Sequence, residues 1–237
     1  MTRPRIILTG ENIRCMVDQQ NGGRVSSLIA HGRELLVTQS SQTNLQQWGL
    51  YPMAPYAGRV RNGKFNFDSQ NHQLEMNLPP HAIHGTVFDR PFMVVESSPT
   101  SVRMQIDLGP QFRFYGQVTQ TITVEDNMVN FELELSTSNE KMPGQVGWHP
   151  WFARPCRIET AFKKMYVRDK FVLMTFGAVQ SQPKEGFAGV LHGLLQPNVA
   201  VIAKPVPDQK SSGPERAGIK RSEFIRRQHL DNHPVVG

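Results

Sequence analysis

The chain has 237 residues, with 26 Lys and Arg against 20 Asp and Glu, and a formal net charge of +6 at pH 7. This length is compatible with one large β domain or two small ones. No apolar run approaches the roughly 20 residues that a membrane-spanning helix needs, and the apolar residues 6–8 are too few for a secretory signal. We therefore expect a cytoplasmic protein without a membrane partner.

The cysteines and the basic residues argue against two further classes of protein. Cys15 and Cys156 lie far apart in the chain and in no metal-binding or redox spacing, so we expect two reduced thiols. The basic residues are scattered, and no aromatic residues interleave with them as a stacking platform for nucleic acid requires. We expect no nucleic-acid partner, and the sequence leaves the oligomeric state open.

Strands are predicted from the beginning of the chain. The first is expected at residues 6–8, and residues 24–29 and 34–37 flank a turn at His31 and Gly32. A second, shorter hairpin is expected from residues 65–67 and 73–76.

The clearest strand patterns lie in the middle of the chain. Residues 102–108 and 129–135 each place apolar side chains on one face and polar side chains on the other. Residues 119–124 are expected to pair with 129–135 across a turn at 125–127. Because no helical periodicity interrupts these strands, the sequence predicts an all-β fold, a large antiparallel β-sandwich.

The sequence changes character near residue 180. Beyond this point the apolar alternation is lost, and Pro, Gly and basic residues dominate. We expect residues 1–186 to form the β-sandwich domain and residues 187–237 to form an atypical, partly disordered tail. Within the tail, residues 199–203 are expected to be an isolated strand and residues 222–227 a short helix.

An arginine-bearing turn, PYAGRVRN at residues 55–62, is the first candidate for a binding site. Gly58 lets the backbone approach a ligand closely, and Arg59 follows it. A guanidinium presents five donors in one plane, which suits neighbouring hydroxyl groups, and Arg61 or Asn62 can face the same pocket. Taken alone, Arg59 is better explained as a loop arginine that is solvated or paired with a carboxylate.

Two histidine motifs supply groups that titrate near neutral pH. His81 and His84 belong to HAIHG at residues 81–85; their spacing is close to that of metal ligands, but a zinc site needs three or four, so no metal is expected. His149 lies in GWHPWF at residues 147–152, where aromatic rings such as Trp151 can pack on a sugar while the imidazole transfers a proton. The alternatives are structural histidines and an aromatic core cluster.

Together, the three motifs predict a site that holds a polyol and transfers protons. The chain has no nucleophile motif, no phosphate-cradling glycine loop and no dinucleotide fingerprint. Covalent and nucleotide chemistry are therefore poorly supported, and no cofactor is expected.

In this order, the motifs resemble those of the aldose 1-epimerase family, the galactose mutarotases. Residues 55–65 are similar to the family's arginine-bearing loop, residues 81–85 to its first histidine motif and residues 147–152 to its second. The resemblance extends to about residue 186. Predicted strands also fit the family, at residues 22–28, 31–36 and 117–122.

The resemblance implies a galactose mutarotase-like β-sandwich that interconverts the α and β anomers of a free hexose, such as galactose, in carbohydrate metabolism. His149 would be the general acid that protonates the ring oxygen, and His84 would hold or polarise the same region. Arg59 would bind sugar hydroxyls, with Asn62, His81 and Trp151 as further substrate-binding residues. No cofactor would take part.

The resemblance ends before the family's catalytic base. The family places a glutamate in a late strand to take the proton of the anomeric hydroxyl, and neither Glu185 nor Glu223 stands in a matching context. The tail at residues 187–237 replaces the expected C-terminal strands, and a shifted reading frame is one hypothesis for it. Three alternatives stay open: an inactive carbohydrate-binding protein, a hexose-6-phosphate epimerase and a non-functional fragment.

Overall fold

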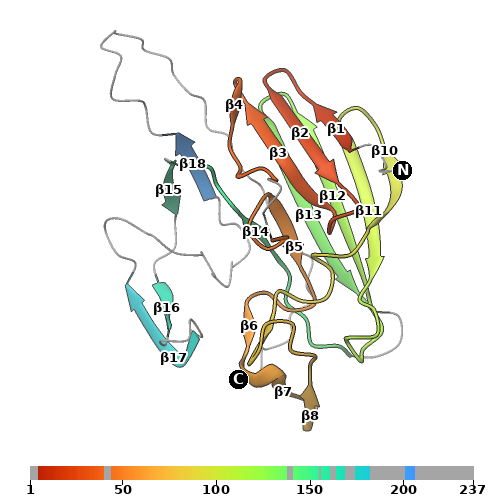
Figure 1. Cartoon of the computed structure of the whole chain (residues 1–237), viewed down its shortest axis with the longest axis vertical. Helices are drawn as coiled ribbons and strands as arrows, with labels where there is room; N and C mark the ends of the chain where they lie inside the picture. Colours follow the sequence, from red (N-terminus) through yellow and green to blue (C-terminus); the bar gives the residue numbers. More distant parts are fainter. Residues whose placement is uncertain are drawn as a thin grey trace.

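Two antiparallel β-sheets make up most of the computed structural model, which describes residues 5–39, 44–137, 141–154, 156–160, 164–168, 174–181 and 201–205. Figure 1 shows them packed face to face. Over these ranges there is no α-helix, only the 3-10 turn η1 (Arg61–Gly63). No helix in the described parts of the chain is long and apolar enough to cross a bilayer.

The first sheet has the strand order β1-β2-β3-β5-β14, with the short β4 beside β3. It begins with the N-terminal strands and takes in β14 from much later in the chain. Its strands are β1 (Ile6–Thr9), β2 (Ile13–Asp18), β3 (Arg24–Ala30), β4 (Arg33–Glu34), β5 (Leu50–Met53) and β14 (Gly147–Pro150).

The second sheet is a meander of four strands in chain order. These strands are β10 (Met93–Ser97), β11 (Ser101–Asp107), β12 (Gln117–Glu125) and β13 (Met128–Ser136). The predicted turn is found at Asp126 and Asn127, where β12 and β13 join. In β11 and β13 the predicted apolar faces point inward, while Arg103 and Glu132 are exposed on the other side. The period-two pattern therefore located β11 and β13 correctly, and β12 was predicted from its pairing with β13, whereas β10 was not predicted.

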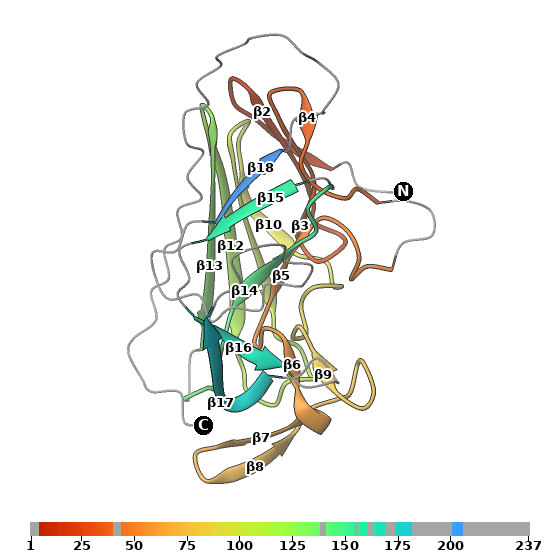
Figure 2. The same cartoon turned by 90° about the vertical axis from the view of Figure 1, so that its left-hand side faces the viewer.

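The hydrophobic core lies between the two sheets. Cys15 and Val17 of β2 belong to the same buried cluster as Met104 of β11 and Ile122 of β12. The view in Figure 2, turned by 90°, separates β12 and β13 from β2 and β4. The antiparallel β-sandwich predicted from the sequence is confirmed.

Four short strand pairs complete the described structure. The pair β6 (Arg59–Val60) and β9 (Ala82–Ile83) and the hairpin β7 (Lys64–Phe67) and β8 (Gln70–Gln73) lie at the lower end in both views. The other two are β15 (Cys156–Thr160) with β18 (Val201–Pro205), and β16 (Lys164–Arg168) with β17 (Met174–Ser181).

Three strand predictions need correction. The second strand of the short hairpin is β8, not residues 73–76, because Asp68 and Ser69 adopt positive φ and turn the chain directly after Phe67. Strand 34–37 is reduced to β4, after which Leu36 bridges to Phe152. The strand expected at 199–203 is found as β18, and it is not isolated because it pairs with β15. The predicted helix at 222–227 and most of the predicted tail lie outside the described residues, and the domain boundary at 186 stays a prediction.

Candidate active site

His149 is placed by the pairing of β14 with β5. The register sets His149 opposite Tyr51, and the two rings stack with centroids 5.0 Å apart and an interplanar angle of 11°. Both side chains are buried, His149 at 5% and Tyr51 at 0% exposure. A strand pair formed by residues almost a hundred positions apart thus fixes one imidazole against a tyrosine.

His84 reaches the same place through an unusual backbone. Both His84 and Gly85 have positive φ, 61° and 80°, and His84 N donates to Gly58 O at 2.9 Å. A Cβ at Gly85 would overlap the carbonyl oxygen of Ala54, so only glycine fits there. The backbone conformation of the HAIHG motif therefore turns the His84 ring inward, and His84 is 4% exposed.

The two histidines predicted from separate motifs meet. The ring centroids of His84 and His149 are 5.0 Å apart at an angle of 74°. Three aromatic rings surround the pair: Tyr51 lies 5.9 Å from His84, Phe88 lies 6.5 Å from His84, and Trp151 stacks on His149 at 5.4 Å. We call these five residues the histidine site.

Burial shapes the chemistry of the tyrosine in this site. It raises the pKa of the Tyr51 phenol to about 12, while the nearby Trp151 and Arg24 act in the opposite direction. The phenol thus stays protonated to a higher pH than an exposed tyrosine, and the imidazole of His149 stacks on a neutral ring.

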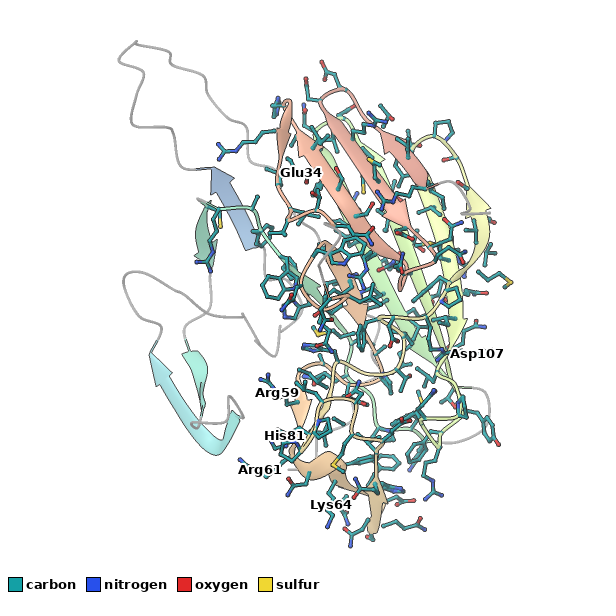
Figure 3. All side chains as sticks on the ribbon, viewed as in Figure 1. Glu34, Arg59, Arg61, Lys64, His81 and Asp107 are labelled. Carbon is teal, nitrogen blue, oxygen red and sulfur yellow. The ribbon has the colours of Figure 1, made fainter. Side chains whose placement is uncertain are left out.

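Arg59 lies on β6, directly before the loop that carries its neighbours. It is half-buried, and its Cα is paired with that of Ile83, the residue that precedes His84. Figure 3 shows Arg59, Arg61 and His81 gathered at the same end of the molecule. Among the described residues the one salt bridge joins Arg5 to Asp18, so Arg59 is not paired with a described carboxylate.

His81 and Asn62 are joined to each other. The backbone N of Asn62 donates to Nδ1 of the buried His81 at 3.2 Å, and Asn62 itself is exposed with a φ of 52°. This bond ties the arginine-bearing loop to the HAIHG segment, which gives His81 a structural task. Substrate contacts by His81, Asn62 and Trp151 stay predictions.

Sequence reasoning missed two residues here: Tyr51, a member of the histidine site, and Arg24, which contacts it. Arg24 lies over the Tyr51 ring, 5.1 Å from its centroid. Neither residue stands in a recognisable motif, since Tyr51 is one apolar residue in the short strand LYPM. Only the register of β3, β5 and β14 reveals them, and that register cannot be read from local pattern.

Within the described ranges, no three His, Cys, Asp or Glu side chains come close enough together to hold a metal ion. The histidine site contributes two imidazoles and no further ligand of this kind.

Comparison with known proteins shows which family and fold the chain resembles. The family model for aldose 1-epimerase matches residues 5–165. A candidate aldose 1-epimerase from Escherichia coli K12 superposes with a TM-score of 0.68 at 20% identity, covering 77% of this chain and 63% of that chain. No curated protein matches the chain in sequence.

Two further solved structures show the same fold. A galactose mutarotase-like protein from Clostridium acetobutylicum has a TM-score of 0.66 at 19% identity, with 74% of this chain and 60% of that chain covered. An aldose epimerase homologue from C. elegans has a TM-score of 0.65 at 18% identity, with coverages of 75% and 61%. The chain spans less than two thirds of the length of each of these relatives. Since the family model matches well over half of the chain, this protein belongs to the aldose 1-epimerase family.

Proposed function

We propose that this protein is an aldose 1-epimerase that interconverts the α and β anomers of a free hexose. The observation that carries the proposal is the histidine site: two buried imidazoles with centroids 5.0 Å apart, set in a wall of aromatic rings. Family membership supports the reaction class, and the geometry supports the two groups that would perform it.

The reaction is a redox-neutral rearrangement, so proton transfer and positioning are all it needs. His149 donates a proton to the ring oxygen as a base removes the proton of the anomeric hydroxyl, and the bond between C1 and the ring oxygen breaks. The open aldehyde rotates about C1–C2 and closes on its other face, which returns both protons. Positioned acid–base groups of this kind each contribute about 10²–10⁴-fold.

The other predicted residues fit binding roles around this centre. His84 lies edge-on to His149 and can hold or polarise the same ring oxygen. Arg59, half-buried beside the His84 segment, can donate to two neighbouring hydroxyls. Asn62 is exposed on the adjoining turn, and Trp151 offers a ring face to the sugar.

No described residue is assigned as the general base that removes the proton of the anomeric hydroxyl. Glu185 and Glu223 do not match the family's late glutamate, and both lie outside the described residues. This departure favours one alternative function, a carbohydrate-binding protein that keeps the histidines and the arginine but does not accelerate the exchange. The predicted cytoplasmic location stays a prediction.

The decisive experiment measures anomer exchange by NMR magnetisation transfer on equilibrated glucose and galactose. We expect exchange faster than in buffer, and we expect His149→Ala to lower it by at least about 10²-fold. His31→Asn is the matched control, because His31 is exposed in a turn with a φ of 50° that asparagine tolerates.

Each other outcome has a distinct meaning. Sugar-dependent shifts of protein resonances without faster exchange would indicate a binding protein. Exchange of glucose 6-phosphate but not glucose would indicate a hexose-6-phosphate epimerase. A His149→Ala variant as fast as wild type would remove His149 from the mechanism.

A further inference from the structure

A fully buried arginine lies behind the aromatic wall of the histidine site. Arg24 opens β3, is 0% exposed, and forms no salt bridge with any described carboxylate. Its guanidinium instead donates to four backbone carbonyl oxygens, those of Asn21, Leu45, Trp48 and Phe88. Buried charges are costly unless they are well bonded, so a buried cation that has no carboxylate partner among the described residues calls for a reason.

These hydrogen bonds join the segments that carry the site. Leu45 and Trp48 lie just before β5, which holds Tyr51, and Nη1 of Arg24 donates to both. Phe88 follows the HAIHG segment, and Nη2 donates to its carbonyl at 2.9 Å. One guanidinium therefore sets the position of the Tyr51 strand relative to the chain that continues from His84.

Aromatic contacts fix the guanidinium and the tyrosine to each other. The guanidinium carbon lies 4.2 Å from the Trp48 ring centroid and 5.1 Å from the Tyr51 centroid. Burial lowers the pKa of Arg24 to about 10, against the attraction of Tyr51, Asp18 and Asp89. The side chain therefore keeps its charge at neutral pH, and the cation–π contacts persist there.

The strand register places the side chains of Arg24, Tyr51 and His149 in one row across the sheet. Val25 is opposite Leu50, so antiparallel pairing places Arg24 across from Tyr51, and Tyr51 is opposite His149. Because β5 lies between β3 and β14, the Tyr51 ring stands between the guanidinium and the imidazole.

We propose that Arg24 is a positioning residue of the histidine site: it holds the Tyr51 ring on which His149 stacks and the segment that follows His84. The kinetic consequence rests on the proposed epimerase function. Arg24 and Tyr51 are both 0% exposed and cannot touch a sugar, so a change at Arg24 should alter kcat rather than KM.

The test is Arg24→Lys, which keeps the charge but cannot reach all four carbonyl groups. We expect kcat for anomer exchange to fall by about 10-fold or more, with KM within about threefold of wild type. We also expect the ring resonances of His149 to shift in ¹H–¹³C correlation spectra, since the ring current of Tyr51 acts on them.

Arg90→Lys is the matched control. Arg90 also donates only to backbone carbonyls, those of Thr86, Asp107 and Leu108, but it makes no ring contact with Tyr51. We expect its variant to lose stability without moving the His149 resonances; kcat is not part of this control, because Thr86 belongs to the segment that follows His84. A second test variant, Trp48→Leu, removes the other ring contact of the guanidinium and should shift the same His149 resonances by a smaller amount.

The spectra separate this proposal from the proposed function. If the wild-type protein does not accelerate exchange, the epimerase function fails, and the His149 resonances still decide the role of Arg24. Folded Arg24→Lys and Trp48→Leu variants with unchanged His149 resonances would overturn the positioning role. It would be overturned equally if neither variant folds or if Arg90→Lys moves His149 as far, because Arg24 would then be a general structural residue.

Discussion

Among the described residues, two clusters bury histidine rings between aromatic side chains next to an arginine. One is the histidine site, on β5, β14 and the His84 segment. The other, which we call the His72 cluster, joins the β7–β8 hairpin to the 112–114 segment. It consists of Phe65, Phe67, His72, Phe112, Arg113 and Phe114.

The ring nitrogens of His72 are both engaged by its own cluster. Nδ1 lies 3.1 Å from Nη1 of Arg113, which can only donate, so Nδ1 accepts and Nε2 carries the proton toward Phe67 O at 3.3 Å. His72 is therefore held in one ring orientation as a structural residue. In the histidine site, by contrast, two imidazoles from distant segments face each other. Similar residue types thus serve anchoring in one place and, under the proposed function, acid–base chemistry in the other.

The largest expected effect is the loss of stability in Gly85→Ala, which tests whether the backbone at Gly85 holds His84 in the histidine site. The new Cβ would overlap the Ala54 carbonyl at a φ of 80°, so the His84 segment must leave its place. We expect a loss of about 4 kcal/mol or more in the free energy of unfolding, or no folded protein. Urea denaturation followed by circular dichroism measures it.

Gly32→Ala is the control for this substitution. Gly32 also has a positive φ, 75°, but no atom lies within 4 Å of a Cβ built there. It should lose only about 1 kcal/mol from backbone strain. Equal losses in the two variants would show that the close approach to Ala54 does not fix the His84 segment.

The next largest effect is expected from His72→Ala. It tests whether His72 contributes to folding stability and not to anomer exchange. The variant loses the stack on Phe65, the contact with Phe114 and two hydrogen bonds, so we expect about 3 kcal/mol of destabilisation. Anomer exchange per folded molecule should stay within about threefold of wild type, the reverse of the pattern for His149→Ala. A loss of exchange without a loss of stability would place His72 in the active chemistry and remove the distinction.

Local pattern predicted much of the fold. The alternation in β11 and β13 predicted their inward faces, and the predicted turn was found at Asp126 and Asn127, between β12 and β13. In β3 the alternation fails, because residues from Arg24 to Leu28 are all buried. That strand was located from the turn after it, and nothing in it predicted a buried arginine.

The His84 part of the site was predictable because the backbone demanded a special residue there. Gly85 must be glycine because of the Ala54 carbonyl, which is why HAIHG is visible as a motif. Tyr51 and Arg24 act through side-chain contacts across strands, for which several residue types fit locally. Their roles follow from long-range register, which a single sequence does not show.

The smallest expected effect is a pH dependence of stability. It distinguishes the two clusters, because the histidine site contains a buried phenol and the His72 cluster contains none. Burial raises the pKa of Tyr51 from 10 to about 12, so between these values the unfolded chain loses this proton while the folded chain keeps it. Stability is therefore lost as pH rises from 10 to 12, by roughly 2 kcal/mol from this group.

Tyr51→Phe removes the phenol, and its free energy of unfolding should fall less steeply with pH than that of wild type. Tyr115→Phe, whose side chain is 83% exposed, should follow wild type. If the free energy of unfolding depended on pH in the same way in all three proteins, the Tyr51 phenol would not be buried between Arg24 and His149. The proposed row of side chains across β3, β5 and β14 would then be wrong at Tyr51.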